Sequence, residues 1–300
     1  MKKSQSKKRF SKHILLSIMA MIFLTVLAGC SSADEAEATG EKEETKRPIL
    51  IQGPMPIEAE TFAERLENVK VEESGSTYEF YIGTVDGYPV IVSKTGKGME
   101  NAAASTAIAI EKYNPAAIIN QGTSGGHDPE LNVFDIVLGE RTVNIGSMKT
   151  GDRAAGEGIE PTDWKPMDVM ASEGSAGEDP NAEKARYYEG DADLLAAANA
   201  VKDSYTKGKI VEGTIGSADL WNNEVDRINW FHENYGTSVE EMESASVAMI
   251  SKAYDVPFLA IRILSNNKTN DGAYNADTAI ANQEYVYEVV KEYIASLESE

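Results

Sequence analysis

Three short segments of the sequence hold side chains that could act on a sugar. Glu58 follows a turn rich in proline, Pro54 to Pro56, and the run from Val239 to Ala245 holds three acids around Met242. The third segment, Asn120 to His127, is predicted to be a glycine-rich turn after a strand, and it also carries hydroxyl groups. Carboxylates can stabilise positive charge, bind hydroxyl groups or activate water. Glycine-rich segments let backbone N–H groups approach a ligand. Together these residue types favour a site that binds the hydroxyl groups of a sugar.

Strands are predicted to position these segments. Short apolar runs at Ile49–Gln52 and Ala116–Gln121 precede the first and third segments. A further strand, Val256–Leu264, contains Arg262 and continues into polar residues that end at Asn267. Ligands of open α/β sheets bind at the carboxyl ends of strands, so we expect one shared site. The acids from Glu240 onward are predicted to start a helix, with at least one side chain facing inward because helical neighbours diverge by ~100°. Acids that merely suit the helix dipole are the alternative.

The remaining pattern predicts an α/β layered fold, with short strands alternating with helices rich in alanine. A hairpin is expected around Asp86-Gly87. The segment Lys149–Asp191 is too long for an ordinary connection, so we interpret it as a lid or an irregular insertion. The other expected strands are Tyr78–Val92 in two runs, Val133–Gly139 and Lys209–Ile215, and the expected helices are Glu100–Tyr113, Asp193–Tyr205, Glu224–Tyr235, Ser244–Tyr254 and Ala281–Leu297.

The amino-terminal region has the features of a lipoprotein signal. Basic residues precede an apolar run from Ile14 to Leu27, which is too short to span a bilayer, and Leu27-Ala28-Gly29-Cys30 follows. We predict removal of residues 1–29 and lipidation of Cys30, with residues 30–47 forming an acidic flexible tether and residues 48–300 a single catalytic domain. The protein would then be exported and lipid-anchored to the outer face of the bacterial cell membrane. An uncleaved anchor is the alternative.

Charge and residue spacing exclude several kinds of partner. The formal net charge is −21, and loss of the basic leader makes the remainder more acidic, which argues against nucleic acid. Cys30 is the only cysteine, so no disulfide is expected. His127 and His232 have no cysteine or acidic residue at metal-ligand spacing, and we predict no metal and no cofactor.

The order of the motifs resembles the nucleoside phosphorylase and nucleosidase superfamily, most closely the 5′-methylthioadenosine/S-adenosylhomocysteine nucleosidases. The resemblance implies a single three-layer domain with a mixed central sheet flanked by helices, and hydrolysis of the N-glycosidic bond of a purine nucleoside. It also implies a homo-oligomer. The motifs are Gly53-x-Met55-x-x-Glu58, Lys94-x-Gly96-x-Gly98, Ile119-Asn120-x-Gly122-Thr123-Ser124-Gly125-Gly126, Asp135-Ile136-Val137, Glu241-Met242-Glu243 and Arg262-x-x-Ser265.

The same resemblance implies roles for single residues. Glu58 would deprotonate the attacking water beside Thr123, and Glu243 would bind the ribose hydroxyls. The substrate-binding residues would be Thr123, Gly125, Glu241, Met242, Arg262 and Ser265, of which Glu241 and Arg262 would orient Glu243. Trp221 or Leu220 would stack on the purine, although either could be structural.

Asn266 departs from the family pattern, which has an aspartate there to protonate the purine. An amide cannot supply that proton, but it can pair with adenine in a bidentate manner or face a 6-oxopurine. We count Asn266 with Glu58 and Glu243 among the catalytic candidates. Asn267 and Lys268 could compensate, or form a plain polar loop.

Two other functions stay open at this point. A phosphorylase needs cations around phosphate, and Gln121 and Thr123 provide none where phosphorylases of the superfamily carry an arginine, so hydrolysis is favoured. Lys94 and Lys97 keep phosphorolysis possible. The second alternative is a catalytically weak lipoprotein that only binds nucleosides at the cell surface.

Overall fold

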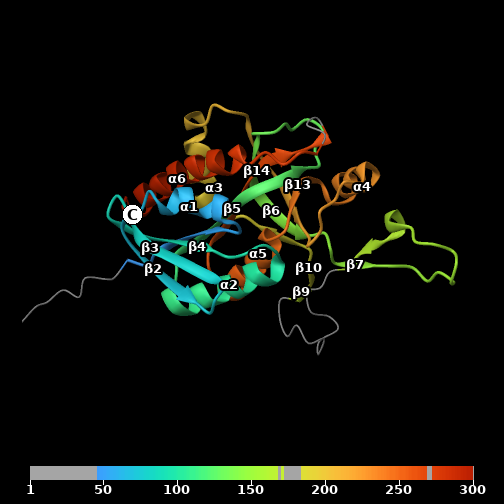
Figure 1. The fold of residues 1–300 in the computed structure, drawn as a ribbon, viewed down its shortest axis with the longest axis horizontal. Helices are drawn as coiled ribbons and strands as arrows, with labels where there is room; N and C mark the ends of the chain where they lie inside the picture. The colour runs from blue at the N-terminus through green and yellow to red at the C-terminus, as the bar shows by residue number, and fades with distance from the viewer. Residues whose placement is uncertain (1–45, 168–169, 172–183, 269–271, 300) are drawn as a thin grey trace, which may run out of the picture. The chain divides into compact units, whose positions relative to one another are not determined.

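The computed structural model describes residues 46–167, 170–171, 184–268 and 272–299. Their main feature is a mixed sheet in the order β11-β6-β12-β13-β5-β1-β4-β3-β2, in which β14 also pairs with β5 and β6 (Figure 1). The strands are β1 (Ile49–Gly53), β2 (Glu67–Ser74), β3 (Tyr78–Val85), β4 (Tyr88–Lys94), β5 (Ala117–Gly126), β6 (Ile136–Asn144), β11 (Tyr187–Glu189), β12 (Ile210–Ser217), β13 (Thr237–Glu241) and β14 (Phe258–Asn266).

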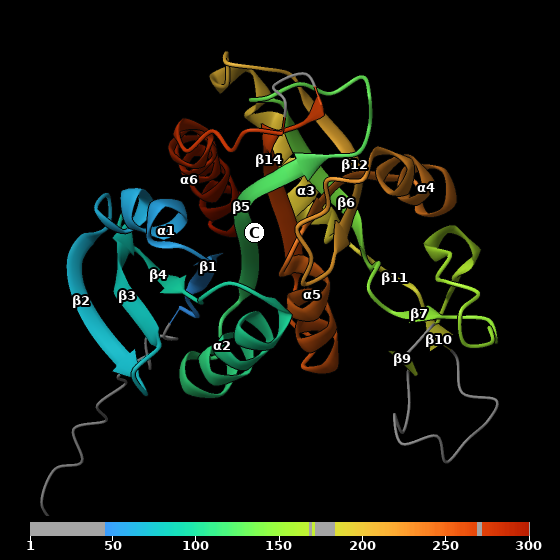
Figure 2. The same ribbon diagram turned by 45° about the vertical axis from the view of Figure 1, so that its right-hand side comes forward.

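Helices cover both faces of this sheet, which gives the three-layer α/β domain that the sequence predicts. Figure 2 shows α1 and α6 on one side and α2 and α5 on the other. Each side has its own apolar core, centred on residues such as Phe62 and Val286 or Leu50 and Val247. The helices are α1 (Pro56–Ala63), α2 (Met99–Tyr113), α3 (Ala192–Ala200), α4 (Val225–Tyr235), α5 (Ser244–Ala253) and α6 (Asp277–Leu297), with short 3-10 turns at Pro161–Asp163 and Lys202–Ser204.

The predicted hairpin and most predicted elements are present. The strands β3 and β4 pair antiparallel around Asp86 and Gly87, both of which have positive φ, as a two-residue hairpin turn requires. Each predicted helix is found, although α3 ends at Ala200, five residues before its predicted end, and α6 begins at Asp277, four residues before its predicted start. Helix α1 and strands β2 and β13 were not predicted.

Two local predictions are wrong. The segment Gly122–Gly126 is not a turn but the end of β5, because its backbone pairs with β14 on one side and β13 on the other. Glu240 and Glu241 do not start a helix but end strand β13, and α5 begins only after Glu243. Strand pairing on both flanks outweighs local preference in each case.

The segment 149–191 is only partly described. It contains the short strand pair β7 (Met148–Lys149) and β8 (Lys165–Pro166), the pair β9 (Met170–Ala171) and β10 (Lys184–Ala185), and β11 at the edge of the main sheet. Its role as a lid stays a prediction. The leader, Cys30 and the tether up to residue 45 lie outside the described residues. Within the described residues, no helix has the length and apolarity needed to cross a membrane.

Candidate active site

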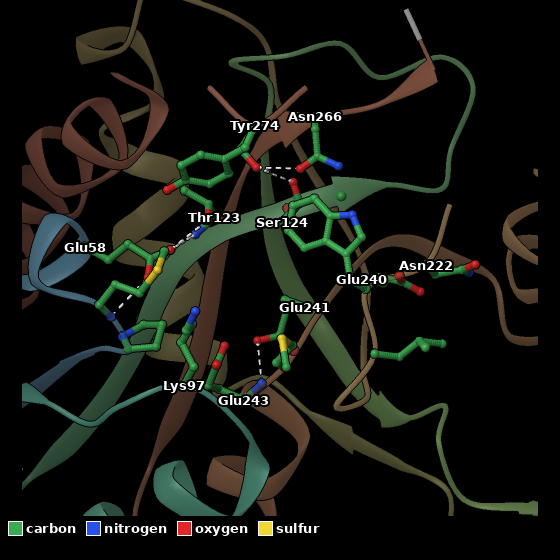
Figure 3. A pocket seen from close by; sticks show the side chains of 17 residues that line it. Glu58, Lys97, Thr123, Ser124, Asn222, Glu240, Glu241, Glu243, Asn266 and Tyr274 are labelled. Atoms are coloured by element: carbon green, nitrogen blue, oxygen red, sulfur yellow. Dashed lines mark hydrogen bonds between the residues drawn. The ribbon is translucent and has the colours of Figure 1, made fainter. Parts of the chain in front are cut away.

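A cavity of about 310 Å³ opens at the carboxyl ends of β5, β13 and β14. Every predicted catalytic or substrate-binding residue lines it except Arg262. Figure 3 shows Glu58 and Asn266 on opposite sides of the cavity, with Glu241 and Glu243 beneath. The lining consists of Pro54, Met55, Glu58, Lys97, Thr123, Ser124, Gly125, Leu220, Trp221, Asn222, Glu240, Glu241, Met242, Glu243, Ser265, Asn266 and Tyr274.

Glu58 is a buried carboxylate held in a fixed orientation. It lies in the first turn of α1, where Pro56 fixes the backbone at the helix start. Its Oε1 accepts hydrogen bonds from the backbone N–H and the hydroxyl of Thr123, both at 2.7 Å, and its Oε2 accepts one from the N–H of Met55 at 3.2 Å. Burial raises the pKa of Glu58, while the bonds from Thr123 lower it. Such a carboxylate is poised to take a proton.

Gly122 lets this carboxylate approach strand β5. A Cβ at Gly122 would lie 3.0 Å from Oε1 of Glu58 and 3.4 Å from the ring of Pro54. The glycine that the sequence motif places before Thr123 is therefore a steric requirement of the Glu58–Thr123 contact.

Glu241 and Arg262 form a buried ion pair under the cavity floor. Oε2 of Glu241 lies 2.5 Å from one terminal nitrogen of Arg262 and 3.0 Å from its Nε. Arg262 also donates to the carbonyl oxygen of Asn120 at 3.0 Å and has no exposed surface. The prediction that Arg262 binds substrate is therefore replaced by a positioning role, because its guanidinium is fully engaged below the lining.

Glu241 itself acts mainly on its own strand-to-helix junction. Its carboxylate accepts from the backbone N–H groups of Glu243 and Ser244, and it also contacts the hydroxyl of Ser217. The pair with Arg262 and these bonds occupy both oxygens. Glu241 thus fixes the backbone from which Glu243 projects, as the resemblance implied.

Glu243 is the carboxylate left available for a ligand. Its Oε1 accepts from the N–H of Gly98 at 2.9 Å, and its Oε2 lies 3.7 Å from Arg262. Gly98 has φ of +98°, a conformation that suits glycine. Burial first, and then the charge of Glu241, raise the pKa of Glu243 to about 8, against a lowering effect of Arg262. The second glycine of the Lys94-x-Gly96-x-Gly98 motif therefore serves Glu243.

The raised pKa of Glu243 predicts a pH-dependent stability. Its ordinary value is 4.5, so between pH 4.5 and about 8 the folded protein keeps a proton that the unfolded chain releases. The free energy of unfolding must then fall as pH rises through this window. We expect Glu243→Gln to unfold several degrees above the wild type at pH 8.5 and close to it at pH 4.5, measured by calorimetry. The exposed Glu233→Gln is the control, and an equal shift at both pH values would contradict the assignment.

Ser265 and Asn266 form the end of the cavity where the resemblance places the purine. The hydroxyl of Ser265 lies 2.8 Å from Oδ1 of Asn266 and 3.1 Å from the carbonyl oxygen of Ser124. With Oδ1 bonded to Ser265, the Nδ2 group of Asn266 faces Gly125, where a Cβ would lie 3.4 Å away. Asn266 therefore presents a hydrogen-bond donor, not an acid, to the cavity.

Three further side chains line the cavity, and two of them were predicted from the sequence. Trp221 lines the cavity and is 59% exposed, so it is available for stacking and is not the buried structural tryptophan of the alternative interpretation. Leu220 lines it as well. Tyr274 was missed, and no strand end or motif marks it in the sequence. Burial raises the pKa of Tyr274, and the charge of Glu58 adds to this effect.

Neither of the compensating candidates, Asn267 and Lys268, lines this cavity, and of the two lysines that kept phosphorolysis possible only one does. Asn267 is buried and donates to the carbonyl oxygen of Leu131 at 2.8 Å, which is a structural contact. The ammonium group of Lys94 lies 2.7 Å from Glu79 and 3.6 Å from Glu60. Lys97 is the lysine that lines the cavity.

His127 does have an acidic partner, which sequence spacing did not reveal. Its Nε2 lies 2.9 Å from Glu240 and its Nδ1 lies 2.7 Å from the hydroxyl of Thr237. The described residues nevertheless contain no group of three or more histidine, cysteine or acidic side chains arranged to hold a metal.

Comparison with known proteins identifies the family of this chain. Residues 48–295 match the phosphorylase superfamily. The 5′-methylthioadenosine/S-adenosylhomocysteine nucleosidase of Anoxybacillus flavithermus is 31% identical over 73% of this chain and 84% of the relative. That of Shewanella pealeana is 32% identical over 77% and 91%. The chain therefore belongs to the phosphorylase superfamily and, within it, to the family of 5′-methylthioadenosine/S-adenosylhomocysteine nucleosidases.

Solved structures agree with this fold. The Neisseria meningitidis nucleosidase in complex with methylthio-immucillin-A superimposes with a TM-score of 0.65 at 24% identity, over 82% of this chain and 99% of that one. The Colwellia psychrerythraea nucleosidase in complex with adenine gives the same TM-score and identity, over 82% and 96%. At this level of identity, the two comparisons show a shared fold.

Proposed function

We propose that this protein hydrolyses the N-glycosidic bond of purine nucleosides of the 5′-methylthioadenosine/S-adenosylhomocysteine type. The observation that carries the proposal is the buried Glu58, bonded to Thr123, in one cavity with Glu243 and Asn266. Relatives with more than 30% identity are 5′-methylthioadenosine/S-adenosylhomocysteine nucleosidases, and one related structure is a complex with adenine.

The site supports a mechanism with a sugar cation as its transition state. A water molecule beside Glu58 gives a proton to the carboxylate while its oxygen bonds to C1′, and the electrons of the C1′–N9 bond pass to the purine. The carboxyl group of Glu243 accepts hydrogen bonds from the ribose hydroxyls, and in its ionised form its charge stabilises the oxocarbenium ion. Asn266 donates a hydrogen bond to the departing purine, which takes its proton from solvent.

The charge of the cavity favours water over phosphate as the nucleophile. Glu58 occupies the N–H and hydroxyl groups of Thr123 that an anion would need, and Glu240, Glu241 and Glu243 also line the cavity. Among the described lining residues, Lys97 alone faces these four acids, since Lys94 is paired with Glu79. A phosphate dianion would therefore find a single cationic side chain there, and the donors of Thr123 are already engaged by Glu58.

The direct test of the function is release of free base. The chain from Pro48 to Glu300 is incubated with methylthioadenosine, S-adenosylhomocysteine, adenosine and inosine, with and without phosphate, and products are separated by chromatography. We expect base and free sugar without phosphate. Ribose 1-phosphate products would indicate a phosphorylase, and binding with no release over hours would indicate the nucleoside-capturing lipoprotein instead.

We further propose that the mature protein is lipidated on Cys30 and held on the outer face of the bacterial membrane. The support is the sequence of the leader and the start of the family match at Pro48, which leaves the first 47 residues outside the catalytic domain. Cells grown with a labelled fatty acid should label the wild type but not Cys30→Ser. Equal labelling, or recovery of both proteins in the soluble fraction, would contradict this proposal.

We also propose a homo-oligomer. Leu220, Trp221 and Val225 are exposed apolar side chains next to the cavity mouth, where a second copy could cover them. Sedimentation equilibrium should give a mass above that of one chain at micromolar concentration, whereas a monomer at all concentrations would exclude the oligomer.

A further inference from the structure

The end of strand β5 lines the cavity with Thr123, Ser124 and Gly125. Thr123 and Gly125 share one face of the strand, since residues two apart on a strand point the same way. Thr123 contacts Glu58 at the reaction centre. The next position on this face, Gly125, has no side chain and leaves a bare floor. A purine attached to a ribose at Glu58 and Thr123 would lie over that floor.

Gly125 is flanked by Glu240 and Asn266. It pairs with Glu240 of β13 on one side and with Asn266 of β14 on the other. Neighbouring strands lie about 5 Å apart, so the two flanking Cα atoms are separated by ~10 Å across the floor. Paired residues share a face of the sheet, and both side chains line the cavity. A carboxylate and an amide therefore face each other across the predicted position of the base.

Glu240 is held by His127. Nε2 of His127 lies 2.9 Å from Oε2 of Glu240, and Nδ1 lies 2.7 Å from the hydroxyl of Thr237. The imidazole is 4% exposed and stacks on Phe231 with an interplanar angle of 1°. We assign the hydrogen to Nε2, with Nδ1 accepting from Thr237, because an ionised Glu240 needs a donor.

This arrangement leaves one oxygen of Glu240 for a ligand. Within the described residues, Oε1 of Glu240 has no hydrogen-bond partner, although the residue is only 9% exposed. Glu240 also lines the adjoining cavity of about 370 Å³, so its carboxylate borders both spaces. A carboxylate oxygen of this kind, which faces a cavity without a partner from the protein, is complementary to an N–H donor of a ligand.

We propose that Glu240 accepts a hydrogen bond from the exocyclic 6-amino group of the purine while Asn266 donates to N7, with His127 as a positioning residue. The inference rests on the proposed function. Along the edge that carries N7 and the C6 substituent, adenine presents an acceptor beside a donor, which matches an amide and a carboxylate. A 6-oxopurine presents two acceptors on that edge, and its O6 would face the charge of Glu240.

The test compares three substrates that differ only at C6. The full chain in detergent is assayed with 5′-methylthio nucleosides carrying an amino group, hydrogen or oxygen at C6, in the wild type, Glu240→Gln, His127→Gln and the exposed control Glu233→Gln. We expect Glu240→Gln to lower kcat/KM for the 6-amino substrate by about 10- to 100-fold and to leave the 6-hydrogen substrate nearly unchanged. The 6-amino to 6-oxo preference should collapse, and His127→Gln should shift it in the same direction by less.

Binding of free bases keeps this test separate from that of the enzymatic activity. Calorimetry should show tighter binding of adenine than of hypoxanthine by the wild type, with the difference lost in Glu240→Gln. This result would stand even if no nucleoside were cleaved, in which case only the proposed function fails. An unchanged ratio in Glu240→Gln, or an equal loss on all three substrates, would overturn the role of Glu240.

Discussion

Replacing Glu58 by glutamine should lower kcat on methylthioadenosine by about 10²- to 10⁴-fold, the usual contribution of a positioned general base. The amide oxygen of the new side chain can still accept the two bonds from Thr123, so the fold of α1 and the shape of the cavity should persist. An amide, however, cannot take a proton from water. Binding of adenine, measured by calorimetry, should therefore stay close to that of the wild type.

The matched control for this substitution is Glu64→Gln, an exposed position at the end of the same helix. It should leave kcat unchanged. The pH profile offers an independent check: because the pKa of Glu58 is raised, the wild type should lose kcat/KM as the pH falls through that raised value, and the residual rate of Glu58→Gln should lack this limb. Equal activity of Glu58→Gln and wild type would rule out a mechanism in which Glu58 is the general base.

The charges under the cavity explain why these carboxylates differ in function. Among the described residues Arg262 is the one fully buried cation, and its shortest contact with an acid is with Glu241, so Glu241 is neutralised in place. Glu243 is farther from it, at 3.7 Å, and its pKa rises to about 8. A single arginine thus separates neighbouring acids into a structural and a functional one. The cost is a buried acid that destabilises the free protein at high pH.

Much of the site could be predicted because it depends on strand ends. The segments of Glu58, Thr123 and Asn266 each follow an apolar run in the sequence, and parallel pairing of β1, β5 and β14 brings those runs together. Motif order then identified the family. The glycine at position 122 was predicted as a turn residue, but what it provides is space for the carboxylate of Glu58.

The rest could not be predicted because it depends on pairing across the sheet. Local sequence favours a helix around Glu240, and only the pairing of β13 with β5 and β12 shows that it flanks Gly125. The contact between His127 and Glu240 joins residues 113 positions apart. Tyr274 reaches the cavity from the connection between β14 and α6, which carries no motif.

The substitution Asn266→Asp should raise kcat on methylthioadenosine by about 10²- to 10⁴-fold, because it restores a group able to donate a proton to the leaving purine. Glu240 lines the same cavity, and its negative charge should favour the protonated form of the new carboxyl. The hydroxyl of Ser265 can keep its bond to the oxygen at this position. Steady-state rates of adenine release at several pH values measure the effect, which should be lost as the pH rises and the new acid ionises.

The control is Asn222→Asp, which adds the same charge to the cavity lining at a position away from Ser265. It should not raise kcat, because proton donation requires a position next to the purine nitrogen. A faster Asn266→Asp with an unchanged Asn222→Asp would identify Asn266 as a lost acid, so that the natural protein releases its purine without full protonation. A slower Asn266→Asp would instead mean that the amide is needed to recognise the base, acting together with Glu240 across Gly125 as a specificity device.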